Sequence, residues 1–329
     1  MKSSQFIKIL REKQILLPPL SGYTDYPFRV ILAGFQPPFL TTEMANARAI
    51  LQNNWRTLQI LKIAKGRHYN GVQLVGSIPE HMQKAAVMLQ DHGFDYIDIN
   101  MGCTARKIAC RGEGISLMKQ EQRAYDIVKA VSDAVDLPVT CKLRLGASKK
   151  TINVLSLSQK LVDAGAVALT VHGRSGEKKF GVPLDLDIIR KTVQAVPVPV
   201  VANGGIYTGT DALEMIQKTG AAAVMPGRGL LGNPWLVPEI QAVLSGQGFT
   251  PPSLQQRKKI CLRHLELLID FYDERRAILR MRSILPHYFS KCMFLKELKK
   301  DVVQANTAKD ITLLIQRIQE NKAHLVYSI

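Results

Sequence analysis

The chain has 329 residues, of which 46% are hydrophobic and 22% are charged, and its mean hydropathy is close to zero. This composition excludes the disordered, collagen-like and disulfide-scaffold classes. Its 44 Lys and Arg residues outnumber its 27 Asp and Glu residues, which gives a formal charge of +17. An excess of this size favours a polyanionic partner, most often a nucleic acid, and a solubilising basic surface is the alternative.

The five cysteines, at positions 103, 110, 141, 261 and 292, form an odd and scattered set without a C-x-x-C pair. Such a set suits a reducing compartment and gives little support to a structural zinc site. Charged residues interrupt the first 19 residues, and no run of about eighteen apolar residues occurs in the chain. We therefore expect a cytoplasmic protein with no signal peptide and no membrane span.

Eight short runs of apolar and β-branched residues predict strands, with helical patterns between them. The predicted strands are Ile15–Leu20, Phe39–Met44, Gly71–Gly76, Tyr96–Gly102, Pro138–Gly146, Val167–Arg174, Pro197–Gly205 and Ala221–Leu230. The segments Pro79–His92 and Gln122–Val135 alternate at the helical period, and Gly93, Gly165 and Gly220 stand where helices are expected to end.

Eight strand–helix units within about 240 residues predict the α/β class, as a (β/α)8 TIM barrel. The structural alternative is a doubly wound open sheet. That alternative is disfavoured because no G-x-G-x-x-G motif follows any predicted strand and because eight units exceed its usual number.

The pattern changes near Gly246–Pro252, after which only helical runs occur, such as Leu254–Arg276 and Ile311–Gln319. Residues 252–329 contain 15 Lys and Arg against 8 Asp and Glu, so both parts of the chain are basic. We expect a barrel domain over residues 1–245 and a small, basic, all-helical domain over residues 246–329.

Polar residues occupy the ends of six consecutive predicted strands: Glu43, Gln73, Asn100, Lys142 with Arg144, His172 and Asn203. The C-terminal ends of barrel strands form one rim, where active sites lie. Any one of these groups could be a hydrogen-bonded core residue. Six strands that each contribute one at the same end point to a ligand, because an unpaired buried polar group costs several kcal/mol.

The last two predicted strands end in glycine-rich turns, Asn203-Gly204-Gly205 and Gly227-Arg228-Gly229. Glycines allow backbone N–H groups to approach an anion, and the loops after strands 7 and 8 are the usual phosphate site of such barrels. Arg228 can add a bidentate contact. We predict a phosphate site here, with ordinary turn glycines as the alternative.

Cys103 follows a strand end and is expected to be partly exposed, where a thiol can transfer a proton, attack as a nucleophile or bind a metal. Cys141 lies within a strand and is expected in the barrel wall. A zinc set of Cys103, Cys110 and His172 has weak support.

Lys142 suits three roles: a Schiff-base lysine, a phosphate ligand or a donor to a flavin ring. The basic segment Arg106, Lys107 and Arg111 favours a substrate with a phosphate backbone, and a solvated loop is the alternative.

Eight segments, taken together, resemble the tRNA-dihydrouridine synthases. They are Leu17–Asp25, Thr42–Met44, Val72–Ser77, Asp98–Cys103, Cys141–Gly146, Val171–Arg174, Ala202–Ile206 and Gly227–Gly229. They run in family order, and a basic helical tail follows them as it does in that family.

The resemblance implies a TIM barrel that holds FMN and a helical domain that binds RNA. Residues that would surround the isoalloxazine and ribityl parts of the flavin are Pro19, Leu20, Ser21, Gln73, Lys142 and His172. Residues that would hold its phosphate are Asn203, Gly204, Gly205, Gly227 and Arg228. Asn100 and Arg144 would contact the uracil, and Cys103 would be the general acid.

The implied reaction reduces specific uridines of tRNA to 5,6-dihydrouridine. NADPH reduces the FMN, flavin N5 gives a hydride to uracil C6, and the Cys103 thiol gives a proton to C5. The expected partner is tRNA, with no metal, and the protein is expected to be a monomer.

One residue departs from the family pattern, because Thr104 stands where a proline usually follows the catalytic cysteine. This departure could reflect a different loop geometry or a different RNA target, such as rRNA. Two further functions compete with the implied one. The first is a flavin barrel that acts on a small molecule, as dihydroorotate dehydrogenases do, and the basic tail disfavours it. The second is an RNA-binding protein that has lost catalysis.

Overall fold

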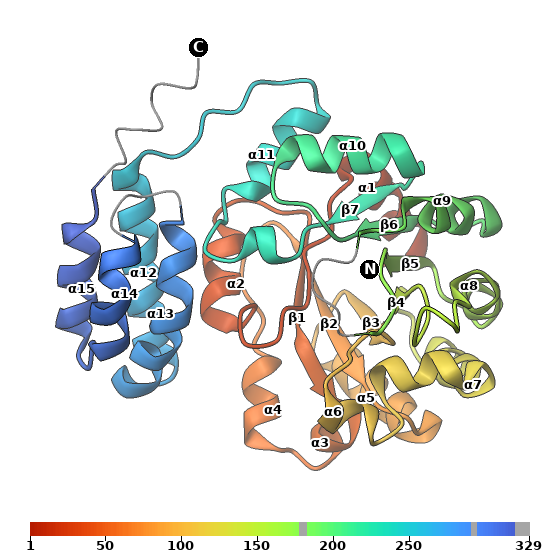
Figure 1. Ribbon diagram of the computed structural model, residues 1–329. Helices are drawn as coiled ribbons and strands as arrows, with labels where there is room; N and C mark the ends of the chain where they lie inside the picture. The colour runs from red at the N-terminus through yellow and green to blue at the C-terminus, as the bar shows by residue number, and fades with distance from the viewer. Residues whose placement is uncertain (178–182, 291–294, 320–329) are drawn as a thin grey trace.

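The computed structural model describes residues 1–177, 183–290 and 295–319. Its centre is a parallel sheet of seven strands whose order in space is their order in the sequence (Figure 1). The strands are β1 Phe39–Asn46, β2 Tyr69–Val75, β3 Tyr96–Asn100, β4 Val139–Arg144, β5 Ala168–His172, β6 Val200–Asn203 and β7 Ala223–Met225. Each coincides with one of the predicted strands after the first.

The first predicted strand is reduced to a single bridge that closes the barrel. Ile15 pairs in parallel with Val224 of β7. Val224 N donates to Gln14 O at 2.9 Å, and Leu16 N donates to Val224 O at 3.0 Å. On the other side, the Thr41 hydroxyl of β1 donates to the Leu17 carbonyl at 2.7 Å. The pairing goes no further because Pro18 and Pro19 have no N–H group to donate. The barrel prediction is confirmed, and the sequential strand order excludes the doubly wound sheet.

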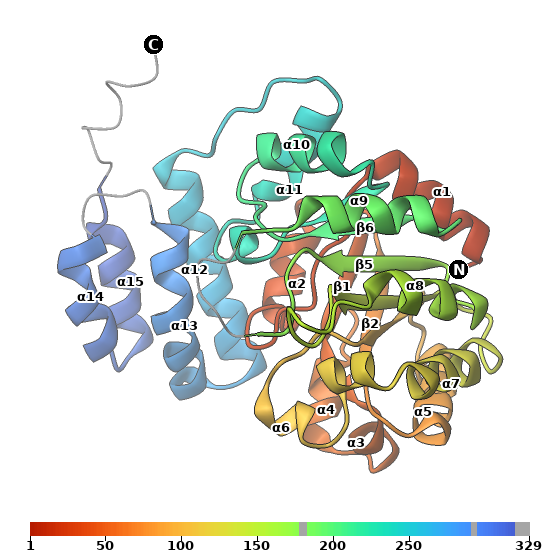
Figure 2. The same ribbon diagram turned by 45° about the vertical axis from the view of Figure 1, so that its right-hand side comes forward.

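Helices form the outer layer around the strands, and α8–α10 flank β5–β7 in both views (Figures 1 and 2). They include α2 Tyr26–Ala33, α5 Pro79–Asp91, α7 Glu121–Ser132, α8 Val154–Asp163, α9 Leu186–Ala195, α10 Gly209–Thr219 and α11 Leu236–Leu244. The predicted helices at 79–92 and 122–135 are therefore confirmed. Gly93, Gly165 and Gly220 follow α5, α8 and α10 with φ of 98°, 108° and 69°, a left-handed conformation that favours glycine.

The N-terminal end of the barrel is covered by α1, Ser3–Lys13. Phe6 and Leu10 of this helix are fully buried against the first residues of the strands. The Phe6 ring lies 4.8 Å from that of Phe39 and 5.2 Å from that of Tyr96, measured between centroids. With this end filled by apolar side chains, the opposite end of the barrel is the one left for polar chemistry.

The C-terminal part is a bundle of α12 Leu254–Phe271, α13 Glu274–Tyr288, α14 Leu295–Gln304 and α15 Ala308–Arg317, which lies beside the barrel (Figure 1). Its own apolar cluster includes Cys261, Leu265, Leu268, Met281, Leu285, Ile311 and Ile315. The predicted run 254–276 is two helices rather than one, because the Asp273 side chain accepts from Arg276 N at 2.8 Å and starts α13. Among the described residues, no helix is long and apolar enough to cross a membrane.

Candidate active site at the barrel rim

Parallel pairing arranges the polar residues of β2–β6 in rows that rise toward the C-terminal rim. Gln73, Asp98 and Thr140 pair across β2, β3 and β4 in the lowest row. Asn100 pairs with Lys142 in the row above. Arg144, His172 and Asn203 pair across β4, β5 and β6 in the top row. The rows bring together six of the residues predicted at strand ends: Gln73, Asn100, Lys142, Arg144, His172 and Asn203.

A chain of buried hydrogen bonds fixes the lower rows. Asn100 Nδ2 donates to Gln73 Oε1 at 2.7 Å, and Gln73 Nε2 donates to Asp98 Oδ2 at 2.6 Å. The Thr140 hydroxyl donates to Asp98 Oδ1 at 2.7 Å. Burial raises the pKa of Asp98, while these two donors act in the opposite direction. Asp98 is not among the predicted site residues. It lies two residues before Asn100 in β3, so both side chains point to the same face of the strand.

Asn100 also shapes the loop that carries Cys103. Its Oδ1 accepts hydrogen bonds from Gly102 N at 3.2 Å and from Cys103 N at 2.9 Å, while Cys103 O accepts from Ile115 N at 3.0 Å. Cys103 is half-buried, as predicted, and Cys141 is fully buried in the wall, also as predicted. The N–H of Thr104, which the usual proline would lack, has no acceptor in the described part of the chain. The loop is held instead by the hydrogen bonds with Asn100 and Ile115.

Arg144 joins this loop to the loop after β5. Its Nε donates to Gly102 O at 2.9 Å, and one of its terminal nitrogens donates to Ser175 O at 2.9 Å. The guanidinium has five N–H groups, so these bonds leave others for a ligand. Burial lowers the pKa of Arg144, and the neighbouring Arg174 lowers it further.

Lys142 is positively charged near neutral pH, whereas His172 is neutral. Lys142 Nζ donates to Asn203 Oδ1 at 2.8 Å, and Asn203 Nδ2 donates to Met225 O at 2.8 Å. Burial lowers the pKa of Lys142 to about 8, so the ammonium form dominates near neutral pH. Burial and then the charge of Lys142 lower the pKa of His172 to about 2, so this imidazole is neutral.

A cavity of about 420 Å³ opens beside Lys142 and His172. Its lining includes these predicted residues: Leu20, Lys142, His172, Asn203, Gly204, Gly205, Gly227 and Arg228. Pro18 and Arg174 also line it, whereas Pro19, the exposed Ser21 and the buried Gln73 do not. Eight of the predicted residues thus line one cavity. They come from strand ends and loops on both sides of the Ile15–Val224 bridge that closes the barrel.

The glycines shape this cavity in two ways. Gly204 has a φ of 122°, and a Cβ there would come within 2.6 Å of Leu184 and 3.0 Å of His172. A Cβ on Gly227 would meet no atom within 4 Å, so a side chain there would extend into open space. Within the described residues, the N–H groups of Gly204, Gly205 and Gly227 have no acceptor. Unpaired N–H groups beside Arg228 form a site suited to an anion.

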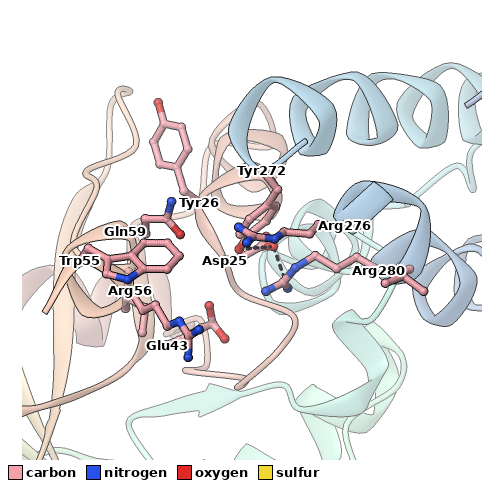
Figure 3. A pocket seen from close by; sticks show the side chains of 11 residues that line it. Asp25, Tyr26, Glu43, Trp55, Arg56, Gln59, Tyr272, Arg276 and Arg280 are labelled. Carbon is pink, nitrogen blue, oxygen red and sulfur yellow. Dashed lines mark hydrogen bonds and ion pairs between the residues drawn. The ribbon is translucent and has the colours of Figure 1, made fainter. Parts of the chain in front are cut away.

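A second cavity, of about 450 Å³, lies where the barrel meets the helical bundle (Figure 3). At its edge Asp25 caps α2 by accepting from Phe28 N at 3.1 Å. The same carboxylate accepts from the Tyr272 hydroxyl at 3.2 Å and from Arg280 at 3.1 Å, both in the bundle. Burial raises the pKa of Asp25 to about 6 despite the charge of Arg280.

The rest of this second cavity includes basic and aromatic side chains and the carboxylate of Glu43. Trp55 is 51% exposed and packs against the Arg56 guanidinium, 5.3 Å from the ring centroid. Arg276 also lines the cavity, and so does Glu43, which lies within β1 at its register shift and accepts from Gly22 N at 2.5 Å. No sequence motif predicts that these residues share a cavity. The fold brings residues 25–59 of the barrel next to residues 272–280 of the bundle.

No group of three His, Cys, Asp or Glu side chains arranged to hold a metal occurs among the described residues.

The chain matches the family model described as "Dihydrouridine synthase (Dus)" over residues 16–323. It is 36% identical over 278 residues to the "Probable tRNA-dihydrouridine synthase" of Rhizobium leguminosarum bv. phaseoli, covering 84% of this chain and 86% of that protein. It is 31% identical to the "tRNA-dihydrouridine synthase B" of Shewanella oneidensis, covering 93% of this chain and 95% of the relative. The solved structure of morphinone reductase has a similar fold, with a TM-score of 0.50 and 12% identity over 74% of this chain and 88% of that one. The resemblance drawn from the motifs is confirmed: the chain belongs to the dihydrouridine synthase family of enzymes.

Proposed function

We propose that this protein reduces specific uridines of tRNA to 5,6-dihydrouridine, with bound FMN as cofactor and NADPH as reductant. Family membership supports the reaction, and the names of the relatives support tRNA as the substrate. The observation that carries the cofactor assignment is the cavity of about 420 Å³, where an anion site and the half-buried ammonium group of Lys142 meet.

The residues present fit FMN. Its phosphate is suited to the unpaired N–H groups of Gly204, Gly205 and Gly227 and to the Arg228 guanidinium, with Asn203 beside them. The space beside Gly227 is open, because a Cβ on this residue would meet no atom within 4 Å, and the phosphate can occupy that space. Lys142, Leu20 and His172 are assigned to the flavin ring and ribityl chain, together with Pro19, Ser21 and Gln73 of the adjoining loop and strand.

The flavin, when bound and reduced, supplies the hydride for uracil C6. The charge of Lys142 stabilises the anionic form of the reduced cofactor, because the Asn203 amide holds this ammonium at the cavity. His172 is neutral, so it contributes a hydrogen bond and no charge.

The uracil is assigned to the space between the cavity and the Cys103 loop. Asn100 and Arg144 are the residues proposed to contact the base, and Arg144 has N–H groups that the scaffold does not use. The Cys103 thiol gives its proton to C5 as the C6–H bond forms on the other face of the ring. One hydride and one proton then account for both hydrogens added across the C5–C6 bond.

The RNA surface is assigned to residues 246–329 together with the cavity between the bundle and the barrel, while residues 1–245 form the catalytic domain. Trp55 offers an exposed ring for base stacking, and Arg56, Arg276 and Arg280 offer contacts to phosphates. A uridine in folded RNA must leave its stack to reach the rim, at a cost of about a few kcal/mol. Phosphate contacts by these cations offset that cost, so binding should weaken steeply with salt.

The cofactor assignment is tested by the absorption spectrum of the purified protein, followed by denaturation and identification of the released chromophore. We expect flavin bands and release of FMN. A colourless protein that also fails to take up added FMN would contradict the assignment and reopen Lys142 as a Schiff-base residue.

A further inference from the structure

A third cavity, of about 490 Å³, lies on the same rim, beside the loop that carries Cys103. Three successive βα segments form it: residues 46–52 after β1, 76–81 after β2 and 111–113 after the Cys103 loop. Helix α3 (Ala47–Leu51), within the first segment, and helix α6 (Arg106–Ala109), just before the third, lie at the lower edge of the barrel in both views (Figures 1 and 2). Neither FMN nor the target uracil is assigned to this cavity.

Glu113 gives this cavity a buried acceptor without a partner. The residue is 7% exposed, and its Oε1 accepts from Asn46 Nδ2 at 3.0 Å. Its Oε2 is buried and has no hydrogen-bond partner in the described chain. Arg48 and Arg111 line the same cavity, yet neither forms an ion pair with Glu113 within the residues described. A buried carboxylate oxygen left unpaired is costly, and a ligand donor in the cavity would satisfy it once the carboxylate turns toward that space.

The backbone places Glu113 close to the reacting centre. The next residue, Gly114, has a φ of 59°, and a Cβ on it would come within 2.8 Å of Cys103 O and 3.2 Å of Cys103 Cβ. Ile115 N donates to Cys103 O at 3.0 Å. A group bound against Glu113 would therefore lie next to the loop that carries Cys103.

The donors and acceptors of this site match one nucleobase best. Asn46 Oδ1 accepts from Ala49 N at 3.2 Å, which fixes the amide so that Nδ2 faces Glu113 and keeps one hydrogen free. The terminal torsion of a glutamate is broad, so the carboxylate can turn Oε2 toward the cavity. It then presents two acceptors beside one donor. The Watson–Crick edge of guanine presents the complement, the N1–H and N2–H donors beside the O6 acceptor.

The rim of the cavity suits the rest of a nucleotide. Arg48 and Arg111 are exposed there, so their guanidinium groups can reach backbone phosphates while the base lies on the buried carboxylate. Adenine, cytosine and uracil lack two adjacent N–H donors on this edge, so only guanine can bond both carboxylate oxygens of Glu113 at once.

We propose that this cavity binds a guanine base of the RNA next to the target uridine, with Glu113 accepting hydrogen bonds from N1–H and N2–H. Glu113 is then a specificity-determining residue, which selects uridines that have a guanosine nearby. The proposal rests on the proposed function, because the base belongs to the RNA substrate.

The test uses RNA substrates in which single guanosines around the target uridine are replaced by inosine, which lacks only the N2 amino group. For the wild-type holoenzyme, one replacement should lower kcat/KM about tenfold, the usual scale for one base contact. Glu113→Gln keeps the size and the bond from Asn46 but puts an N–H where guanine needs an acceptor. It should lower kcat/KM on the guanosine RNA and abolish the inosine effect.

Two outcomes would overturn the proposal: no inosine position that lowers kcat/KM, or an inosine effect that persists unchanged in Glu113→Gln. The matched control is Glu12→Gln on α1, an exposed residue at the other end of the barrel, which should keep the full inosine effect. FMN content and unfolding temperature of each variant report a purely structural loss.

Measuring the binding affinity of the same inosine-substituted RNAs separates this proposal from the proposed function. If the wild type forms no dihydrouridine in any RNA, the proposed function fails, and the affinity series still decides whether Glu113 binds guanine. Binding of free guanosine monophosphate more tightly than the RNA would assign the cavity to a free nucleotide and overturn the proposal.

Discussion

The ammonium of Lys142 donates a hydrogen bond of 2.8 Å to Asn203, across β5, at the ends of β4 and β6. The Asn203 amide is itself fixed, because its Nδ2 donates to Met225 O. This relationship holds one positive charge at the wall of the cavity assigned to FMN, with a pKa of about 8 that burial has lowered. The central claim of the proposed function is that this charge and the glycine turns beside it serve one cofactor.

Replacement of Lys142 by Met should slow uridine reduction about 100-fold, the scale for removal of one positioned charge or donor. The measurement is the rate at which prereduced enzyme is oxidised by RNA in a single turnover. FMN content should remain high, because the phosphate contacts stay in place. An unchanged rate would remove Lys142 from the reaction.

The pH dependence of the wild type should follow the same group. Lys142 carries its charge below its pKa and loses it above, so the rate should fall as pH rises through about 8. Lys142→Arg keeps a charge at higher pH and should move this decline upward. A decline at the same pH in both proteins would assign it to another group.

Replacement of Cys103 by Ala should lower dihydrouridine formation by about 10²- to 10⁴-fold, since a general acid contributes on that scale. RNA affinity should not change, because the thiol donates only during the reaction. Cys110→Ala is the matched control, an exposed cysteine on the same loop. Equal product from Cys103→Ala and wild type would exclude the proposed proton donor.

Gly227→Leu should abolish FMN binding while the protein stays folded. The new side chain extends into the cavity, where a Cβ meets no atom within 4 Å, and it takes the space of the phosphate. Loss of two charge-assisted hydrogen bonds should raise the Kd for FMN at least about 100-fold. Gly248→Leu, at an exposed position with equally open space, is the control. Normal FMN affinity in Gly227→Leu would place the phosphate elsewhere.

Asp25→Asn should change the pH dependence of stability. The pKa of Asp25 is about 6 in the folded protein against 3.8 as its ordinary value, so the folded state holds this proton more tightly. Stability from this group is present at low pH and is lost as pH rises from about 4 to about 6. Two units correspond to about 3 kcal/mol of unfolding free energy.

Asn titrates no proton there and still caps α2 through its Oδ1, so the variant should gain stability relative to wild type as pH rises through that window. The measurement is denaturant unfolding of both proteins from pH 4 to pH 8. A difference in unfolding free energy that does not vary with pH would show that Asp25 is not the titrating group.

The barrel and most of its rim could be predicted because their signals are local. Strand-forming runs, helix-ending glycines and family motifs each lie within a few residues. The first predicted strand is longer than the pairing that the structure contains, since Pro18 and Pro19 end this pairing after one bridge. The sequence does not indicate a role for Asp98, because a lone acidic residue in a short strand does not reveal that Gln73 and Thr140 donate hydrogen bonds to it.

Contacts between distant segments could not be predicted. Asp25 and Arg280 are 255 positions apart, and nothing near either residue indicates that the bundle will bring them together. Glu113 lies in a basic loop whose sequence suggests solvent exposure, and only the packing against Asn46 buries its carboxylate. Such pairs depend on how whole elements dock, which a single sequence does not encode in any short pattern.

The central claim is tested most directly by incubating the purified protein with NADPH and unmodified tRNA transcripts, then measuring dihydrouridine by mass spectrometry of the digested RNA. An rRNA transcript in a parallel reaction tests the alternative substrate. We expect NADPH-dependent formation of dihydrouridine at defined positions of tRNA, and none with Cys103→Ala. A protein that holds FMN and binds tRNA but forms no dihydrouridine would contradict the account.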